Sequence, residues 1–166
     1  MDSLILPITL LYGLIFSLTL GAIVLGSLRY NARLWLQDYP KPIRDKVPPL
    51  SPSEKRERLV VAVLLLGVLF GGLALETIWL RGIPDGISFG AAYLNIFLFL
   101  AIFNLFDALV LDLLILTWLT PRFVILPGTE GMEYLFRDYR KQFADFLKGM
   151  VFCAVASLPF ALLVVI

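Results

Sequence analysis

The sequence contains no histidine and only one cysteine among its 166 residues. Without histidine, the chain lacks the most common general base and a frequent ligand of zinc and haem iron. The single cysteine, Cys153, can form neither an internal disulfide nor a Cys-x-x-Cys redox pair. Because it lies in an apolar run, we predict that it is a small buried core residue. These absences indicate that the protein has no metal centre and no bound cofactor, and they argue against an enzyme.

Charged residues are also scarce. They make up 16% of the chain, whereas hydrophobic residues make up 60%. A soluble domain has about 25% charged and roughly 45–50% apolar residues. This chain has fewer charged and more apolar residues, as is typical of a membrane protein. The net charge of +1 gives no sign of nucleic-acid binding. The composition therefore excludes a disordered chain and a water-soluble globule, and it predicts a protein whose main partner is the lipid bilayer.

Four segments are apolar around their whole circumference, at residues 3–28, 59–80, 88–119 and 147–166. A helix in the core of a soluble protein would carry a polar stripe at a period of about 3.6 residues. Lipid is therefore the better solvent for these segments, and only helices satisfy their own backbone groups there. We predict an all-α integral membrane protein, a single domain folded as a four-transmembrane-helix bundle.

The basic residues predict the orientation of this bundle. Eight of the 14 Lys and Arg residues lie in the connection 29–58, five lie between residues 121 and 148, and Arg81 stands alone. Four crossings place the connections 29–58 and 121–146 on the same side. The positive-inside rule makes that side cytoplasmic. Both termini are then outside, and we expect the protein in a plasma or inner membrane.

Local signals mark several helix ends. The capping box that begins at Ser51 and ends at Glu54 predicts that the second helix starts before its apolar segment. Thr120 and Pro121 predict the end of the third helix. Before the last span, apolar residues recur at steps of three and four, which predicts an amphipathic helix at the cytoplasmic interface. The apolar positions of this stretch are Met132, Leu135, Phe136, Tyr139, Phe143 and Phe146.

Small residues recur at helical spacing on two segments. Gly13, Ser17 and Gly21 follow one another every four residues, and Gly67 with Gly71 forms a GxxxG motif. Such residues allow helix backbones to approach closely in lipid. The spacing fits packing within one bundle, and it also fits the seam of a homo-oligomer or a contact with another membrane protein.

The third apolar segment carries three polar residues that we take as site candidates: Asn104, Asp107 and Asp112. A charge at membrane depth costs about 2.5–3.5 kcal/mol on insertion scales, so each carboxylate needs a physical reason. In an α-helix, residues five apart are about 140° apart around the axis. The two aspartates are therefore not expected to form one pair on one face.

Two interpretations of these candidates stay open. In the first, Asp112 pairs with a cation at the cytoplasmic end, while Asn104 and Asp107 bridge helices. The possible ion-pair partners are Arg29, Arg33 and Arg122. In the second, the carboxylates relay a proton or cation, or belong to a metal or phosphate-handling active site.

Glu76 is the fourth polar candidate, and it lies near the C-terminal end of the second apolar segment. It lies one helical turn from Trp79 and close to Arg81. We predict an interfacial ion pair in preference to a transport carboxylate.

Three functions follow as expectations. The first is a non-enzymatic accessory or scaffold protein that forms oligomers or presents its connections to a partner. The second is a small oligomeric transporter or channel that uses Asp107 or Asp112 for a proton or cation. The third is a lipid-modifying enzyme at the inner interface, which requires an aspartate to meet Arg33 or Arg122 around a phosphate. The candidate aspartates are Asp38, Asp107 and Asp112.

Overall fold

The computed structural model describes residues 5–84 and 86–166. Within these ranges every regular element is a helix and no strand occurs. Four helical stretches are long and apolar enough to cross a membrane, which confirms the prediction of an all-α chain with four helices of that kind. Their elements are α1 (Ile5–Asn31), α3 (Pro52–Arg81), α4 (Phe89–Phe106), the π-helix η2 (Asp107–Leu119) that continues α4, and α5 (Tyr139–Val165).

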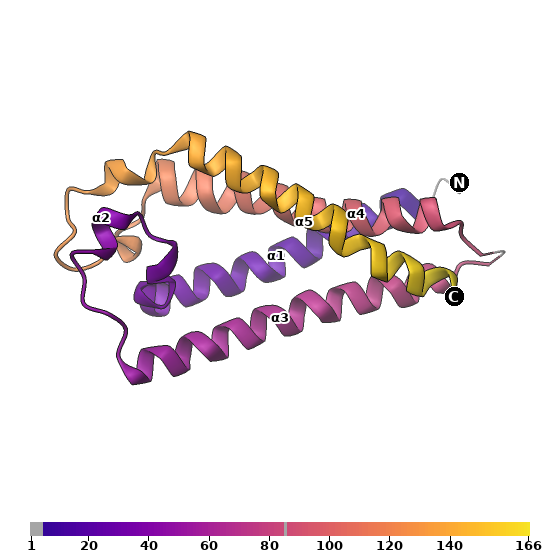
Figure 1. The fold of residues 1–166 in the computed structure, drawn as a ribbon, viewed down its shortest axis with the longest axis horizontal. Coiled ribbons are helices and arrows are strands. Elements are labelled where there is room, and N and C mark those ends of the chain that lie inside the picture. The colour runs from indigo at the N-terminus through magenta and orange to yellow at the C-terminus, as the bar shows by residue number, and fades with distance from the viewer. Residues whose placement is uncertain (1–4, 85) are drawn as a thin grey trace.

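The helices run up and down along a common long axis (Figure 1). Helix α4 packs against α5 and α1, and α3 contacts α1 and α5 at the side of this group. Helix α1 begins and α5 ends beside the short turn between α3 and α4, and we call this the terminus end. Both long connections lie at the opposite end, which we call the connection end. Which side of a membrane each end faces stays a prediction from the basic residues.

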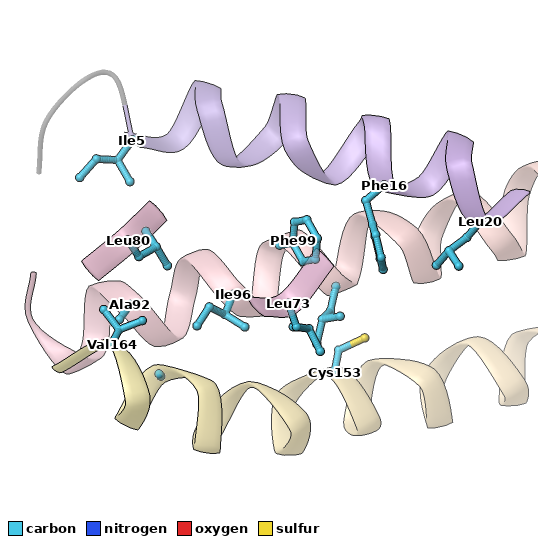
Figure 2. Close-up of a cluster of buried hydrophobic side chains, with 12 residues drawn as sticks. Ile5, Phe16, Leu20, Leu73, Leu80, Ala92, Ile96, Phe99, Cys153 and Val164 are labelled. Carbon is cyan, nitrogen blue, oxygen red and sulfur yellow. The ribbon is translucent and has the colours of Figure 1, made fainter. Parts of the chain in front are cut away.

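The apolar interior of the bundle joins side chains from α1, α3, α4 and α5 (Figure 2). Phe16 packs against Phe99 with ring centroids 4.6 Å apart, and Ile96 is completely buried between the helices. Cys153 is buried in the same cluster, which confirms its prediction as a core residue. The cluster lies mainly toward the terminus end, and this leaves the connection end to be filled by other residues.

Two of the small residues on α1 bring it close to α4, as the packing interpretation predicted. A Cβ atom at Gly13 would lie 2.6 Å from the Ile102 side chain, and one at Gly21 would lie 2.6 Å from the Phe106 ring. The glycines on α3 behave differently, because a Cβ atom at Gly67 or Gly71 would meet nothing within 4 Å. The GxxxG motif therefore makes no close helix contact within this chain.

The two connections fold together over the connection end as a small second core, which we call the cap. Its elements are the 3₁₀-helix η1 (Ala32–Asp38), α2 (Lys41–Arg44), and the 3₁₀-helices η3 (Arg122–Val124) and η4 (Glu133–Phe136). The Tyr39 hydroxyl donates a hydrogen bond of 2.7 Å to the Val124 carbonyl and so joins the two connections. The buried residues of the cap are Leu28, Ala32, Leu36, Tyr39, Ile43, Val124 and Leu126.

The predicted capping box is present at the start of α3. The Glu54 backbone N–H donates to Ser51 Oγ over 3.2 Å, and the Ser51 backbone N–H donates to Glu54 Oε2 over 2.7 Å. Both contacts satisfy backbone donors that a helix N-terminus leaves free. Helix α3 therefore begins at Pro52, about two turns before its apolar segment, as the sequence indicated.

The helix predicted before the last span begins later than expected and is continuous with that span. Residues Glu133–Phe136 form one short 3₁₀ turn, and α5 then starts at Tyr139 and runs without a break to Val165. Asp138 divides the two because its carboxylate accepts a hydrogen bond of 3.0 Å from the Lys141 backbone N–H. This N-cap starts a new helix in the middle of the expected one.

Candidate functional site

The segment that carries the two candidate aspartates is wound as a π-helix from Asp107 to Leu119. Its last hydrogen bond joins the Thr120 N–H to the Ile115 carbonyl over 2.8 Å, a span of five residues. A π-helix has more residues per turn than an α-helix, so residues five apart differ less in direction around its axis. The expected separation of Asp107 and Asp112 assumed α-helical geometry, and the structure brings both residues to one cavity. That they do not form one carboxylate pair stays a prediction.

Both aspartates line a cavity of about 670 Å³ at the connection end, which we call the connection-end cavity. Its apolar walls come from α1, η2 and the cap. Its charged lining residues are Asp38, Lys41, Arg44, Asp107, Asp112, Asp138, Lys141 and Asp145. The cavity therefore combines a lipid-like wall with charges of both signs.

The aspartates of the cavity fall into two groups. Asp138 caps α5, and Asp145 forms ion pairs of 3.1 Å with Lys141 and 2.8 Å with Lys148. Asp38, Asp107 and Asp112 form no ion pair with any residue that the structure describes. Their carboxylates are therefore the ones left to meet a ligand.

The predicted cationic partners lie elsewhere. Arg33 pairs with Glu54 and also donates to the Pro48 carbonyl over 3.0 Å, so it stabilises the start of α3 instead of Asp112. Arg29 and Arg122 are not among the residues that line the cavity. The cations of the site are Lys41, Arg44 and Lys141. Spacing along the sequence gives no sign of them, because the folding of the cap brings them to the cavity.

Asn104 lies one helical turn before Asp107 and joins two helices, as the bridging interpretation predicted. Its amide N–H donates to the Phe146 carbonyl on α5 over 3.1 Å. The side chain fits against Gly149, where a Cβ atom would lie 1.9 Å from Asn104 Oδ1. Asn104 therefore helps to hold α5 beside the aspartate-bearing segment.

Polar contacts join the cap to η2 and α5 beside the cavity. Gln142 donates hydrogen bonds of 2.5 Å to Thr117 Oγ1 and 3.0 Å to the Phe136 carbonyl. Tyr39 also lines the cavity, and burial raises the pKa of its phenol above the usual value. Tyr39 therefore stays neutral and donates its hydrogen bond at physiological pH.

Glu76 belongs to a separate polar group near the terminus end, which we call the Thr9 cluster and which consists of Thr9, Glu76 and Asn95. The Thr9 hydroxyl lies 3.1 Å from Glu76 Oε1 and 3.0 Å from Asn95 Oδ1. Glu76 is only 1% exposed, and it forms no ion pair with Arg81 within the described ranges. The predicted interfacial pair is therefore replaced by a buried contact among three helices.

Comparison of the chain with known protein families, with characterised proteins and with solved structures finds no match.

Proposed function

We propose that the chain is a small, oligomer-forming integral membrane protein that binds a cationic solute in the connection-end cavity and carries it across the membrane. The observation that supports this proposal is that Asp107 and Asp112 line one cavity without a partner among the described residues. Carboxylates at such positions are costly and commonly mark an ion or substrate pathway. A purely structural role would favour pairing them, as Asp145 is paired.

The shape of the site favours an organic cation over a bare metal ion. Nowhere in residues 5–84 and 86–166 do three Asp, Glu, Cys or His side chains come close enough to hold a metal. The carboxylates are instead distributed over a cavity with apolar walls formed by residues such as Leu111 and Phe136. A quaternary ammonium group attached to a small apolar body matches both features.

Transport requires more than one copy of the chain, because four helices enclose little pathway alone. The positive-inside rule places the connection-end cavity on the cytoplasmic side in this proposal. A solute entering there would meet the cap before it meets the aspartates.

The test is the uptake of labelled choline into vesicles that contain the purified full-length protein. Asp107→Asn and Asp112→Asn are expected to lower the initial rate about tenfold or more, since each removes a charge-assisted contact worth about 1.5–3 kcal/mol. Glu130→Gln is the matched control. Glu130 lies in the second connection, is exposed, and does not line the cavity.

Uptake that is the same with and without protein would contradict the proposal. Equal uptake by the wild type and both aspartate variants would show that these carboxylates are not the site. If the protein instead purifies with a second membrane protein at fixed stoichiometry and shows no uptake, the accessory role is favoured.

A phospholipid head group is the second candidate ligand, because the cations Lys41, Arg44 and Lys141 line the same cavity. A zwitterionic head group would place its phosphate near these cations and its amine near the aspartates. This arrangement also fits the lipid-modifying enzyme, with Lys141 and Arg44 in the place predicted for Arg33 and Arg122. Native mass spectrometry distinguishes the two candidates: lipid retained by the wild type and lost in Lys141→Gln favours the head group.

A further inference from the structure

A second cavity, of about 630 Å³, lies between α1 and α3 toward the terminus end, and we call it the α1–α3 groove. Its α1 wall includes Tyr12 and Phe16, and its α3 wall includes Gly71, Glu76 and Trp79. The groove opens sideways, since Tyr12 is 40% exposed in the candidate span. A molecule dissolved in the bilayer can therefore reach it without passing through water.

Among the residues that the structure describes, Glu76 is the only charged side chain that lines this largely apolar groove. Its Oε2 atom is buried and has no hydrogen-bond partner within the described chain. An unpartnered carboxylate oxygen in an apolar interior is costly, so such an atom calls for a donor or cation that the chain itself does not supply.

The Thr9 cluster shows a second shortage of donors. The Thr9 hydroxyl carries one proton but lies within hydrogen-bond distance of two acceptors, Glu76 Oε1 and Asn95 Oδ1. The Asn95 amide N–H is already used on the Ala91 carbonyl at 2.7 Å, which fixes the orientation of that amide. The carboxyl of Glu76 is therefore short of positive partners on both of its oxygens.

Aromatic rings surround the approach to this carboxyl. Tyr12 and Trp79 meet edge to face with centroids 5.7 Å apart, and Phe16 and Phe99 form a second pair. Ring faces attract cations, and the attraction is stronger where water is excluded. A carboxyl at the base of an aromatic groove is complementary to a positive charge carried by an apolar body.

We propose that the α1–α3 groove is a binding site for a lipophilic organic cation, with Glu76 as its counter-ion and Tyr12 and Trp79 as its aromatic contacts. The volume lies within the range of about 300–1,000 Å³ that is typical of small-molecule sites. Gly71 gives the groove its depth, because a side chain there would extend into open space. This proposal does not depend on transport through the connection-end cavity, which shares no lining residue with the groove.

The experiment measures equilibrium binding of labelled tetraphenylphosphonium to the full-length protein in lipid nanodiscs. Tetraphenylborate, which has nearly the same shape and the opposite charge, is the matched probe. We expect saturable binding of the cation and none of the anion. Glu76→Gln is expected to weaken cation binding about tenfold or more, because it removes the charge but keeps the size and hydrogen-bonding capacity of the side chain.

Two glycine variants test the groove without touching the buried carboxyl. Gly71→Leu fills the groove and is expected to abolish saturable binding. Gly67→Leu is its control, because Gly67 lies one turn earlier on α3, is equally open and does not line the groove. Binding by Gly67→Leu that equals the wild type, together with loss in Gly71→Leu, supports the proposal.

Three outcomes would overturn it. Binding of both probes with equal affinity would show partition into lipid, and unchanged cation binding in Glu76→Gln and Gly71→Leu would place the probe elsewhere. Loss of binding in both glycine variants, with a change in oligomeric mass, would show that a second copy of the chain covers this face of α3.

Discussion

At the terminus end of the bundle, Glu76 contacts Thr9 and is 1% exposed, whereas at the connection end Asp107 and Asp112 line a cavity of about 670 Å³. The first end buries its carboxyl between helices, within hydrogen-bond distance of the Thr9 hydroxyl. The second end holds its carboxylates in a space that the cap encloses. Acidic residues in the long apolar helices of one chain are thus kept by two different physical means, and the two ends should respond differently to substitution.

The largest expected effect concerns the cap, since the connection-end cavity depends on it. Leu126 is 2% exposed in the cap core, so Leu126→Ala should lower the free energy of unfolding by about 2–5 kcal/mol. Leu64→Ala is the matched control, because Leu64 is 51% exposed on α3 and its truncation should change stability by about 0.5 kcal/mol or less. Denaturant unfolding in mixed micelles measures both. Equal losses would mean that the cap is not a packed core.

The next largest effect tests the contact between α4 and α5 beside the aspartates. A Cβ atom at Gly149 would collide with the Asn104 amide, so Gly149→Ala should destabilise the protein by about 1–3 kcal/mol. Asn104→Ala in the same chain removes the collision and should recover most of the loss. A double-mutant cycle measures this coupling. Additive effects of the two substitutions would show that the residues do not meet.

The Thr9 cluster tests the terminus end. Thr9→Val keeps the shape of the side chain but removes the hydroxyl that contacts Glu76 and Asn95, leaving two buried acceptors without a donor. We expect a loss of about 1–3 kcal/mol in the free energy of unfolding. Thr19→Val is the control, because the Thr19 hydroxyl bonds only to the Ile15 carbonyl of its own helix. A loss no larger than that of the control would show that the contacts of the Thr9 hydroxyl do not stabilise the fold.

Much of this architecture could be predicted from the residues. The four apolar segments became the four long helices, and the capping box at Ser51 placed the start of α3. Cys153 was correctly predicted to be buried, because a thiol in an apolar run has few alternatives. These features are local, so composition, periodicity and end signals are sufficient to find them.

The site was harder to predict, because it depends on contacts between distant residues. The α-helical period placed Asp107 and Asp112 apart, and no local signal indicated that the segment would be wound as a π-helix. Lys141 reaches the cavity only because Asp138 starts α5 at that point. Glu76 was predicted near Arg81 from sequence distance, while its contacts come from Thr9, 67 residues away.

A smaller effect concerns pH at the cap. Burial raises the pKa of Tyr39, so its neutral form is favoured in the folded state. The stability that this gives is fully present below the unfolded-state pKa near 10 and is lost as the pH rises above it. Tyr39→Phe should cost about 1 kcal/mol at pH 7 through the lost bond to Val124 and should reduce the alkaline sensitivity. Unfolding curves at pH 7 and 11 measure both, and an unchanged pH dependence would contradict this role.

The smallest effect has the opposite sign and separates the two ends most directly. Asp112 forms no ion pair among the described residues, and its carboxylate is partly withdrawn from water, attracted by Lys141 and repelled by Asp145 and Asp38. Asp112→Asn removes the cost of a partly buried charge without breaking a contact, so we expect the free energy of unfolding to rise by about 0.5 kcal/mol while ligand binding is lost. Binding residues are commonly retained at such a cost in stability. A loss of stability as large as that of Thr9→Val would mean that Asp112 is held by the fold in the same way as Glu76, and the difference between the two ends would then disappear.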